Sequence, residues 1–132
     1  MDLEILKIAS NTENNKIINN HTHSSKHKNP ICGDIMEISL KIKDNKIEDF
    51  GYQCKSCIYC QASVSLLSRK AINKSIDSLI NLIKISDTIF EKDNFIFPKE
   101  WFVFNKLFDR KNISRKECLK LPFKTLAKAL KI

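Results

Sequence analysis

The most regular pattern in the chain is a strict alternation of apolar and polar residues between positions 35 and 43. Such alternation predicts a β-strand with one buried face. Its apolar positions are Met36, Ile38, Leu40 and Ile42. Asp44 and Asn45 then supply turn residues, and residues 47–53 form a second, less regular alternating stretch. We therefore predict a β-hairpin, in which Gly51 indicates either a bulge or the close approach of another backbone segment.

Spacings of three and four between apolar residues predict helices in most of the remaining chain. The predicted helices cover residues 3–8, residues 56 or 57 to 72, residues 76–83 and residues 118–132. Ser56 is the expected N-cap of the second helix and Ser75 that of the third. The third helix is expected to bury Ile76, Leu79, Ile80 and Ile83. Pro122 is expected within the first turn of the last helix.

Two stretches carry no sustained period. Residues 11–28 are polar and read as a solvated loop that encloses a short strand around residues 16–19, with three histidines that nothing nearby orients. Those histidines are His21, His23 and His27. Residues 95–108 are rich in aromatic side chains, and Pro98 interrupts them. We expect a short helix after Pro98, and we interpret its aromatic residues, Trp101, Phe102, Phe104 and Phe108, as core rather than as a docking surface.

Composition places the chain among ordinary globular proteins. Its 132 residues, 42% hydrophobic and 29% charged, fit a single domain spanning 1–132. No apolar run could span a bilayer and no signal peptide is recognisable, so we expect a cytoplasmic protein without a membrane partner. Its net charge of +8 comes mostly from scattered lysines, which favours an acidic protein partner over nucleic acid. Five cysteines in a reducing compartment favour metal or catalytic chemistry over disulfides.

Four potential ligands lie where predicted elements begin: Cys32, Asp34, Cys57 and Cys118. Three thiolates and one carboxylate could form a four-coordinate site for zinc or for iron in a cluster. Gly33 can adopt a positive φ angle that lets its two neighbours converge, although an ordinary turn explains this loop equally well. Cys57 is expected at a helix start, where the helix dipole favours a thiolate. A thiolate without metal could instead take up sulfur from a persulfide.

Three motifs resemble those of the NifU/IscU-type iron–sulfur scaffold proteins. They are Asn29-Pro30-Ile31-Cys32-Gly33-Asp34, Cys57 followed by Ala62-Ser63-Val64-Ser65, and Arg115-Lys116-Glu117-Cys118. The resemblance implies an α+β fold, with a small antiparallel β-sheet packed against several α-helices and a metal site at one end. It also implies cluster ligation by Cys32, Cys57 and Cys118 with Asp34 beside them. Residues 1–28 match the family poorly and are expected to form a partly flexible N-terminal segment.

Details of the motifs look more like the SufU branch of this family. Glu117 stands where IscU members have a histidine, and Arg115 lies three residues before Cys118. That branch resembles a zinc-bound sulfur acceptor for a pyridoxal-phosphate cysteine desulfurase of the SufS type. The resemblance implies zinc on Cys32, Asp34, Cys57 and Cys118, with Cys57 or Cys118 as the persulfide acceptor and Cys57 favoured. Ser56 replaces the usual glycine, and Cys54 and Cys60 are additional thiols that we interpret as small buried residues rather than sulfur acceptors.

The sequence therefore predicts a non-enzymatic scaffold and sulfur acceptor for iron–sulfur cluster assembly. It would bind zinc, iron or a transient [2Fe–2S] cluster, take sulfur from a SufS- or IscS-type cysteine desulfurase, and serve downstream iron–sulfur acceptor or carrier proteins. One alternative is a zinc-dependent sulfurtransferase that activates a SufS-type desulfurase without building clusters. A second is a zinc-stabilised structural or nucleic-acid-binding module.

Overall fold

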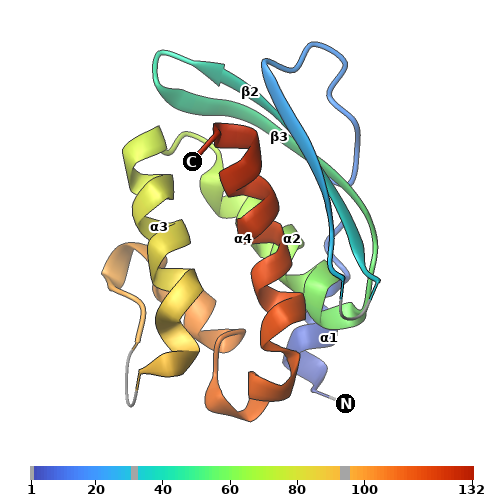
Figure 1. The fold of residues 1–132 in the computed structure, drawn as a ribbon, viewed down its shortest axis with the longest axis vertical. Helices are drawn as coiled ribbons and strands as arrows, with labels where there is room; N and C mark the ends of the chain where they lie inside the picture. Colours follow the sequence, from blue (N-terminus) through green and yellow to red (C-terminus); the bar gives the residue numbers. More distant parts are fainter. Residues whose placement is uncertain (1, 31–32, 93–95) are drawn as a thin grey trace.

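A three-stranded antiparallel β-sheet, covered on one side by helices, forms the centre of the computed structural model (Figure 1). The structure describes residues 2–30, 33–92 and 96–132. The strands are β1 (His23–Lys28), β2 (Ile35–Lys43) and β3 (Lys46–Lys55), in the order β1-β2-β3. Helices α2 (Ile58–Ala71) and α4 (Lys116–Leu130) pack against the sheet, and α3 (Ile76–Thr88) packs against α4. The α+β fold predicted from the sequence is confirmed.

The β2–β3 hairpin forms where the alternating pattern predicted it. Asp44 and Asn45 adopt positive φ angles of 53° and 62°, which turns the chain within two residues. Ile38 and Leu40 of β2 pair with Tyr52 and Phe50 of β3, and these side chains belong to the core beneath the helices. The register shift lies between Lys41 and Ile42, so Gly51 marks a close backbone approach instead of a bulge.

The prediction for residues 11–28 was wrong in one respect, because His23–Lys28 form the edge strand β1 and residues 16–19 form no strand. β1 pairs antiparallel with β2, from His23 opposite Leu40 to Lys28 opposite Ile35. None of its side chains is apolar, so backbone pairing rather than burial holds it in place. One inward contact is the Ser25 hydroxyl, which donates to the carbonyl of Thr125 in α4 at 2.6 Å.

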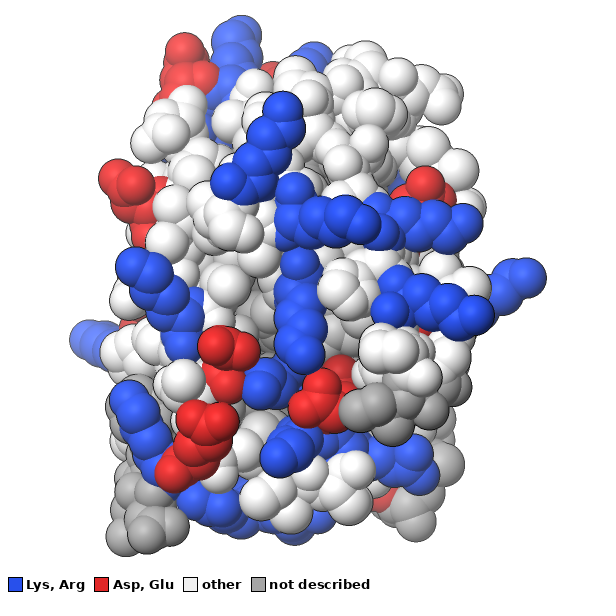
Figure 2. Space-filling model, in the orientation of Figure 1, with Lys and Arg blue, Asp and Glu red and all other residues white. Residues whose placement is uncertain are grey.

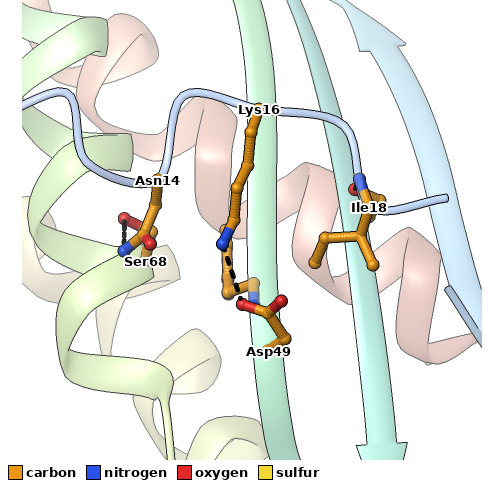
Figure 3. A network of polar contacts seen from close by, with 7 residues as sticks. Asn14, Lys16, Ile18, Asp49 and Ser68 are labelled. Carbon is orange, nitrogen blue, oxygen red and sulfur yellow. Dashed lines mark hydrogen bonds and ion pairs between the residues drawn. The ribbon is translucent and has the colours of Figure 1, made fainter. Parts of the chain in front are cut away.

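Residues 14–18, which we call the strap, cross the face of the sheet opposite the helices (Figure 3). Asn14 accepts a hydrogen bond from the backbone N–H of Tyr52, and its amide donates to the Ser68 hydroxyl of α2 at 3.1 Å. The backbone N–H of Ile18 donates to the Ser39 hydroxyl at 3.2 Å. The strap therefore ties the free edge of β3 and the outer face of β2 to α2.

Where the strap crosses β3, Gly51 leaves room for it. A Cβ atom at Gly51 would lie 2.5 Å from the carbonyl oxygen of Lys16 and 3.1 Å from both Ile18 and Ser39. No side chain larger than hydrogen fits at that distance without moving the strap. The predicted close approach at Gly51 is thus confirmed.

The remaining elements are α1 (Leu3–Ala9) and the 3₁₀ helices η1 (Ile89–Glu91), η2 (Lys99–Lys106) and η3 (Arg110–Arg115). Ser75 caps α3 as predicted, accepting a hydrogen bond from the backbone N–H of Ser78 at 3.2 Å. The prediction that Ser56 caps α2 was wrong. Cys57 occupies the N-cap position with an extended backbone, so it precedes the first turn.

Two further helix predictions were wrong, one for the buried face of α3 and one for the start of α4. Leu82 is fully buried in α3, whereas Ile76, Ile80 and Ile83, which were predicted to be buried, are only half-buried. α4 begins at Lys116, which places Pro122 inside the helix rather than in its first turn. Proline has no N–H for the helical hydrogen bond to the carbonyl four residues earlier, which here belongs to Cys118.

The aromatic stretch forms core, with one exception. η2 is a 3₁₀ helix with about three residues per turn, and Trp101 and Phe104 are its buried residues, followed by buried Leu107 at its C-cap. Phe102 points away from that face and is 59% exposed, contrary to the prediction. Phe104 and Phe108 each contact Phe123 of α4 edge-on, at centroid distances of 5.6 and 5.4 Å.

Candidate metal centre

Asp34, Cys57 and Cys118 come together at one end of the sheet. A carboxylate oxygen of Asp34 and the two Sγ atoms all lie within 4.8 Å of one another. Asp34 and Cys57 are half-buried, and Cys118 is 7% exposed. The structure thus gathers three of the four residues that the sequence suggested as ligands. The fourth, Cys32, lies outside the described residues.

The fold explains this convergence from the order of the elements. Ile35 at the start of β2 pairs with Lys55 at the end of β3, so Asp34 lies beside the connection from β3 to α2. Cys57 is the N-cap of α2, directly after that connection. Cys118 is the third residue of α4, whose N-terminal end packs beside α2. The site therefore joins one strand end to two helix starts.

Hydrogen bonds hold the Asp34 loop closed. The backbone N–H of Asn29 donates to the carbonyl of Asp34, and the N–H of Gly33 donates to the carbonyl of Asn29, each at 2.8 Å. Gly33 has a φ angle of +78°, the left-handed conformation expected of it. Asp34 Oδ2 in turn accepts a long hydrogen bond of 3.4 Å from the backbone N–H of Cys57.

The donor set fits a thiophilic metal ion. Zinc is held by thiolates at about 2.3 Å and by carboxylate oxygens at about 2.0–2.2 Å in tetrahedral sites. Three ligand atoms within 4.8 Å of one another need only small side-chain rotations to reach those distances around one ion. Iron in a cluster uses the same thiolate chemistry. None of the three histidines of the N-terminal segment belongs to this ligand group.

The two additional thiols differ in accessibility. Cys60 is fully buried in α2, and burial raises the pKa of its thiol well above the ordinary value of 9.0. Cys54 is only half-buried, and the pKa of its thiol is raised chiefly by burial, with further contributions from the charges of Asp34 and Cys57. The interpretation of both as small buried residues is thus confirmed for Cys60 and holds only in part for Cys54.

Two residues near the site stack on each other. The guanidinium carbon of Arg115, which precedes α4, lies 5.5 Å from the ring centroid of Tyr59 in the first turn of α2. The sequence indicated Arg115 only through its place in the third motif, and it did not single out Tyr59. No local pattern predicts this pair, because the two residues are 56 positions apart and meet only once α2 and α4 are packed.

A small pocket of about 150 Å³ lies beside the Asp34 loop, between β1 and α4. It is lined by His27, Asn29, Pro30, Glu117, Leu121 and Lys124. His27 is half-buried there, so it is not fully solvated as the sequence suggested. Elsewhere, Figure 2 shows lysine and arginine side chains spread over the visible face with carboxylates among them, consistent with the scattered basic residues of the sequence. Within the described residues, α-helices are too short or too polar to cross a bilayer.

The chain is similar to known proteins in both sequence and fold. Residues 2–99 match the family model described as "NifU-like N terminal domain", a span that includes Asp34 and Cys57 and ends before Cys118. The "Iron-sulfur cluster assembly scaffold protein IscU" of Thermotoga maritima is 32% identical over 105 residues, covering 79% of this chain and 73% of that protein. "Iron-sulfur cluster assembly scaffold protein IscU 1" of Archaeoglobus fulgidus is 38% identical over 56 residues, covering 42% and 37%.

Solved structures share the whole fold. The N-terminal NifU-like protein of Brucella abortus has a TM-score of 0.87 at 25% identity, covering 98% of this chain and 91% of that one. A putative iron–sulfur cluster assembly scaffold protein for the SUF system from Fervidobacterium islandicum has a TM-score of 0.89 at 22% identity, covering 98% and 96%. The similarity extends over α4, so it includes the element that carries Cys118.

Proposed function

Because the chain belongs to the NifU-like N terminal domain family, we propose that it is a scaffold for iron–sulfur cluster assembly. The observation that carries this proposal is the convergence of the Asp34 carboxylate with the Cys57 and Cys118 thiols within 4.8 Å. Cys32, four residues after the end of β1 and two before Asp34, is the proposed fourth ligand. Metal or cluster would then be held by Cys32, Asp34, Cys57 and Cys118.

The mixed donor set suits a site that releases its cargo. Stable iron–sulfur clusters are usually held by four thiolates, which are soft ligands. A carboxylate is a harder and more exchangeable ligand for such a cluster. Asp34 is half-buried, so an incoming ligand could reach and displace it.

Sulfur would be delivered as a persulfide by a cysteine desulfurase of the SufS or IscS type. Cys57 and Cys118 are the candidate acceptors, and their exposure favours Cys57. Cys57 is half-buried at a helix start, whereas Cys118 is only 7% exposed. The scaffold itself would catalyse no reaction, would act in the cytoplasm, and would pass its cluster to downstream acceptor or carrier proteins.

A second candidate function is that of a zinc-dependent sulfur acceptor that activates a desulfurase without building clusters. The closeness of the three ligand atoms favours it, because the group matches the dimensions of a site for a single ion. Both functions use the same residues and differ in the resident metal.

Metal and sulfide analysis of protein purified with and without oxygen tests and separates these functions. A scaffold should yield iron and acid-labile sulfide under anaerobic conditions, whereas a zinc-dependent acceptor should retain one zinc ion under both. Either metal should be lost in Cys57→Ala and in Cys118→Ala. Cys60→Ala is the matched control, since Cys60 is a neighbouring buried thiol outside the ligand group. Folded parent protein that binds neither metal and stimulates no desulfurase would refute both.

A further inference from the structure

Three thiols lie within seven consecutive residues where β3 passes into α2: Cys54, Cys57 and Cys60. Only Cys57 belongs to the ligand group at the end of the sheet. The other two are therefore nucleophilic groups next to the metal centre that metal binding does not use. Their surroundings determine what each can do.

Cys54 lies on the helix-facing side of the sheet. It pairs with Met36 of β2, which is fully buried beneath the helices, and it follows Tyr52 and Phe50 on the same side of β3. Cys54 is thus the residue of this inner row nearest the end of the sheet where Asp34 and Cys57 lie. It remains half-buried, so its thiol is neither sealed in the core nor freely solvated.

Ser56 lies between Cys54 and Cys57, in the connection from β3 to α2. Its hydroxyl oxygen is buried and makes no hydrogen bond within the described part of the chain. The charges of Asp34 and Cys57 both act on Cys54. Cys54 is therefore close to the metal centre, because it lies three positions before Cys57 and its strand partner Met36 lies two positions after Asp34.

Cys60 differs from Cys54 in being fully buried inside α2. A persulfide there would add a sulfur atom to a closely packed core, which is strongly disfavoured. Cys54 has room for the added atom because it is partly accessible at the end of a strand. The two extra thiols are thus distinct, and Cys60 provides a control for any experiment on Cys54.

We propose that Cys54 is a second persulfide acceptor, which takes the sulfane sulfur from a persulfide first formed on Cys57. This inference rests on the sulfur-acceptor role proposed above. The Cys54 sulfur attacks the outer sulfur of the Cys57 persulfide. A new S–S bond forms at Cys54 while the S–S bond at Cys57 breaks, and the proton of the Cys54 thiol ends on the Cys57 sulfur. One thiol and one persulfide are present before and after, so no oxidant or reductant is consumed.

The transfer would let Cys57 serve both as a sulfur acceptor and as a metal ligand, one after the other. This residue cannot ligate a metal ion through its thiolate while the same sulfur carries a persulfide. Moving the sulfane sulfur to Cys54 returns Cys57 to the ligand group and keeps the sulfur beside the site. Metal binding to the freed thiolate should therefore pull the sulfur toward Cys54.

The tryptic peptides of this chain make the test direct. Cleavage after Lys55 separates Cys54, in peptide 47–55, from Cys57 and Cys60, in peptide 56–69. The full-length protein, freed of metal by a chelator, is treated briefly with glutathione persulfide and desalted. Samples are then alkylated at intervals, digested and analysed by mass spectrometry, with and without added zinc. Fragmentation of peptide 56–69 distinguishes Cys57 from Cys60.

Sulfane sulfur should appear first at Cys57 and then in peptide 47–55, and zinc should increase the share in peptide 47–55. Cys54→Ser and Cys54→Ala should both retain the sulfur at Cys57. Cys57→Ser should lose the label on peptide 47–55, and Cys60→Ala should behave like the parent protein. Zinc binding by each Cys54 variant verifies that it is folded.

Two results would overturn the relay while leaving the acceptor function intact. One is sulfur that loads on Cys57 and stays there in the parent protein. The other is labelling of peptide 47–55 in Cys57→Ser at the parental rate, which would mean that Cys54 is loaded directly. If no peptide of the parent protein gains sulfur, the proposed acceptor function itself fails and the relay fails with it.

Discussion

The carboxylate of Asp34 accepts a hydrogen bond from the backbone N–H of Cys57, so one candidate ligand positions another. Cys57 is the N-cap of α2, and its own side chain makes no capping hydrogen bond. The Asp34 carboxylate thus supplies a negative charge at this helix start, where the helix dipole favours one. Only one of its two oxygens is needed for this contact, which leaves the other for a metal ion.

Replacing Asp34 separates its two roles. In Asp34→Ala, we expect a bound cluster to persist several-fold longer and to reach an acceptor protein correspondingly more slowly, because the exchangeable ligand is gone. We also expect a loss of roughly 0.5 kcal/mol in the free energy of unfolding, the low end for a lost helix cap, since the hydrogen bond is long. Cluster absorbance during transfer to an apo-ferredoxin measures the first effect, and urea unfolding of the metal-free protein measures the second.

Asp34→Asn is the matched control for this variant. Its amide oxygen keeps a hydrogen-bond acceptor near Cys57 without the charge, so stability should stay near that of the parent protein while transfer remains slow. Transfer by Asp34→Ala at the parental rate would show that the carboxylate does not govern release.

Gly51 should be essential for the strap to cross the sheet. In Gly51→Ala, the new methyl group would meet the Lys16 carbonyl oxygen at 2.5 Å, and this is a backbone atom that cannot rotate away. We expect a loss of about 1–3 kcal/mol in the free energy of unfolding, as for other overpacked sites. Urea unfolding monitored by circular dichroism measures it.

Gly33→Ala provides the comparison, because a Cβ there would meet nothing within 4 Å but would be held at a φ angle of +78°. Its expected cost of about 1–2 kcal/mol comes from backbone strain alone. In amide hydrogen exchange, Gly51→Ala should expose the N–H groups of Tyr52 and Ile18, whereas Gly33→Ala should leave them protected. Unchanged protection in Gly51→Ala would contradict the close crossing.

The buried end of the strap should contribute more stability than its exposed centre (Figure 3). Asn14→Ala removes the donor to Ser68 in a buried position and should lower the free energy of unfolding by about 1–3 kcal/mol. Lys16→Ala removes only an ion pair with Asp49 at 3.3 Å, in which both side chains are more than a third exposed. That change should cost less than about 1 kcal/mol.

Thermal unfolding of both strap variants under identical conditions measures this difference. Ser68→Ala, alone and combined with Asn14→Ala, completes a double-mutant cycle for the buried contact. Equal losses in Asn14→Ala and Lys16→Ala would mean that the Asn14–Ser68 hydrogen bond does not anchor the strap.

The parts of the fold that the sequence predicted are those in which burial follows a period. β2 and β3 alternate because one face covers the core, and Ser75 caps α3 through a purely local hydrogen bond. β1 has no apolar residue and is held by pairing with β2, so no hydrophobic pattern could indicate it. Its place in the fold is a long-range property.

The candidate site divides in the same way. The sequence indicated which residues could be ligands and that they lie where predicted elements begin. The resemblance of the three motifs to a known family then indicated that these residues form one metal site. The sequence alone did not place Cys118 beside Cys57, because the two residues are 61 positions apart and meet only once α2 and α4 are packed. Nor did it distinguish Cys54 from Cys60, since their different burial arises from a strand end and a helix interior.

Cys60 should make the protein less stable at alkaline pH. Burial raises the pKa of its thiol above the ordinary value of 9.0, so the folded protein holds this proton more tightly than the unfolded chain. The resulting stability is fully present below pH 9 and is lost as the pH rises above it, because the unfolded chain then releases the proton first. The slope for one such group approaches about 1.4 kcal/mol per pH unit.

Cys60→Ala isolates this effect. Near pH 7 the variant should be less stable by about 1 kcal/mol, because a small buried side chain has been removed. Above pH 9 the parent protein should lose stability faster, so the difference between the two should shrink. The raised pKa of Tyr52 acts equally in both proteins and cancels in this comparison. Urea unfolding between pH 7 and about 10.5, with chelator and reductant present, measures the difference, and a constant gap would exclude linkage through Cys60.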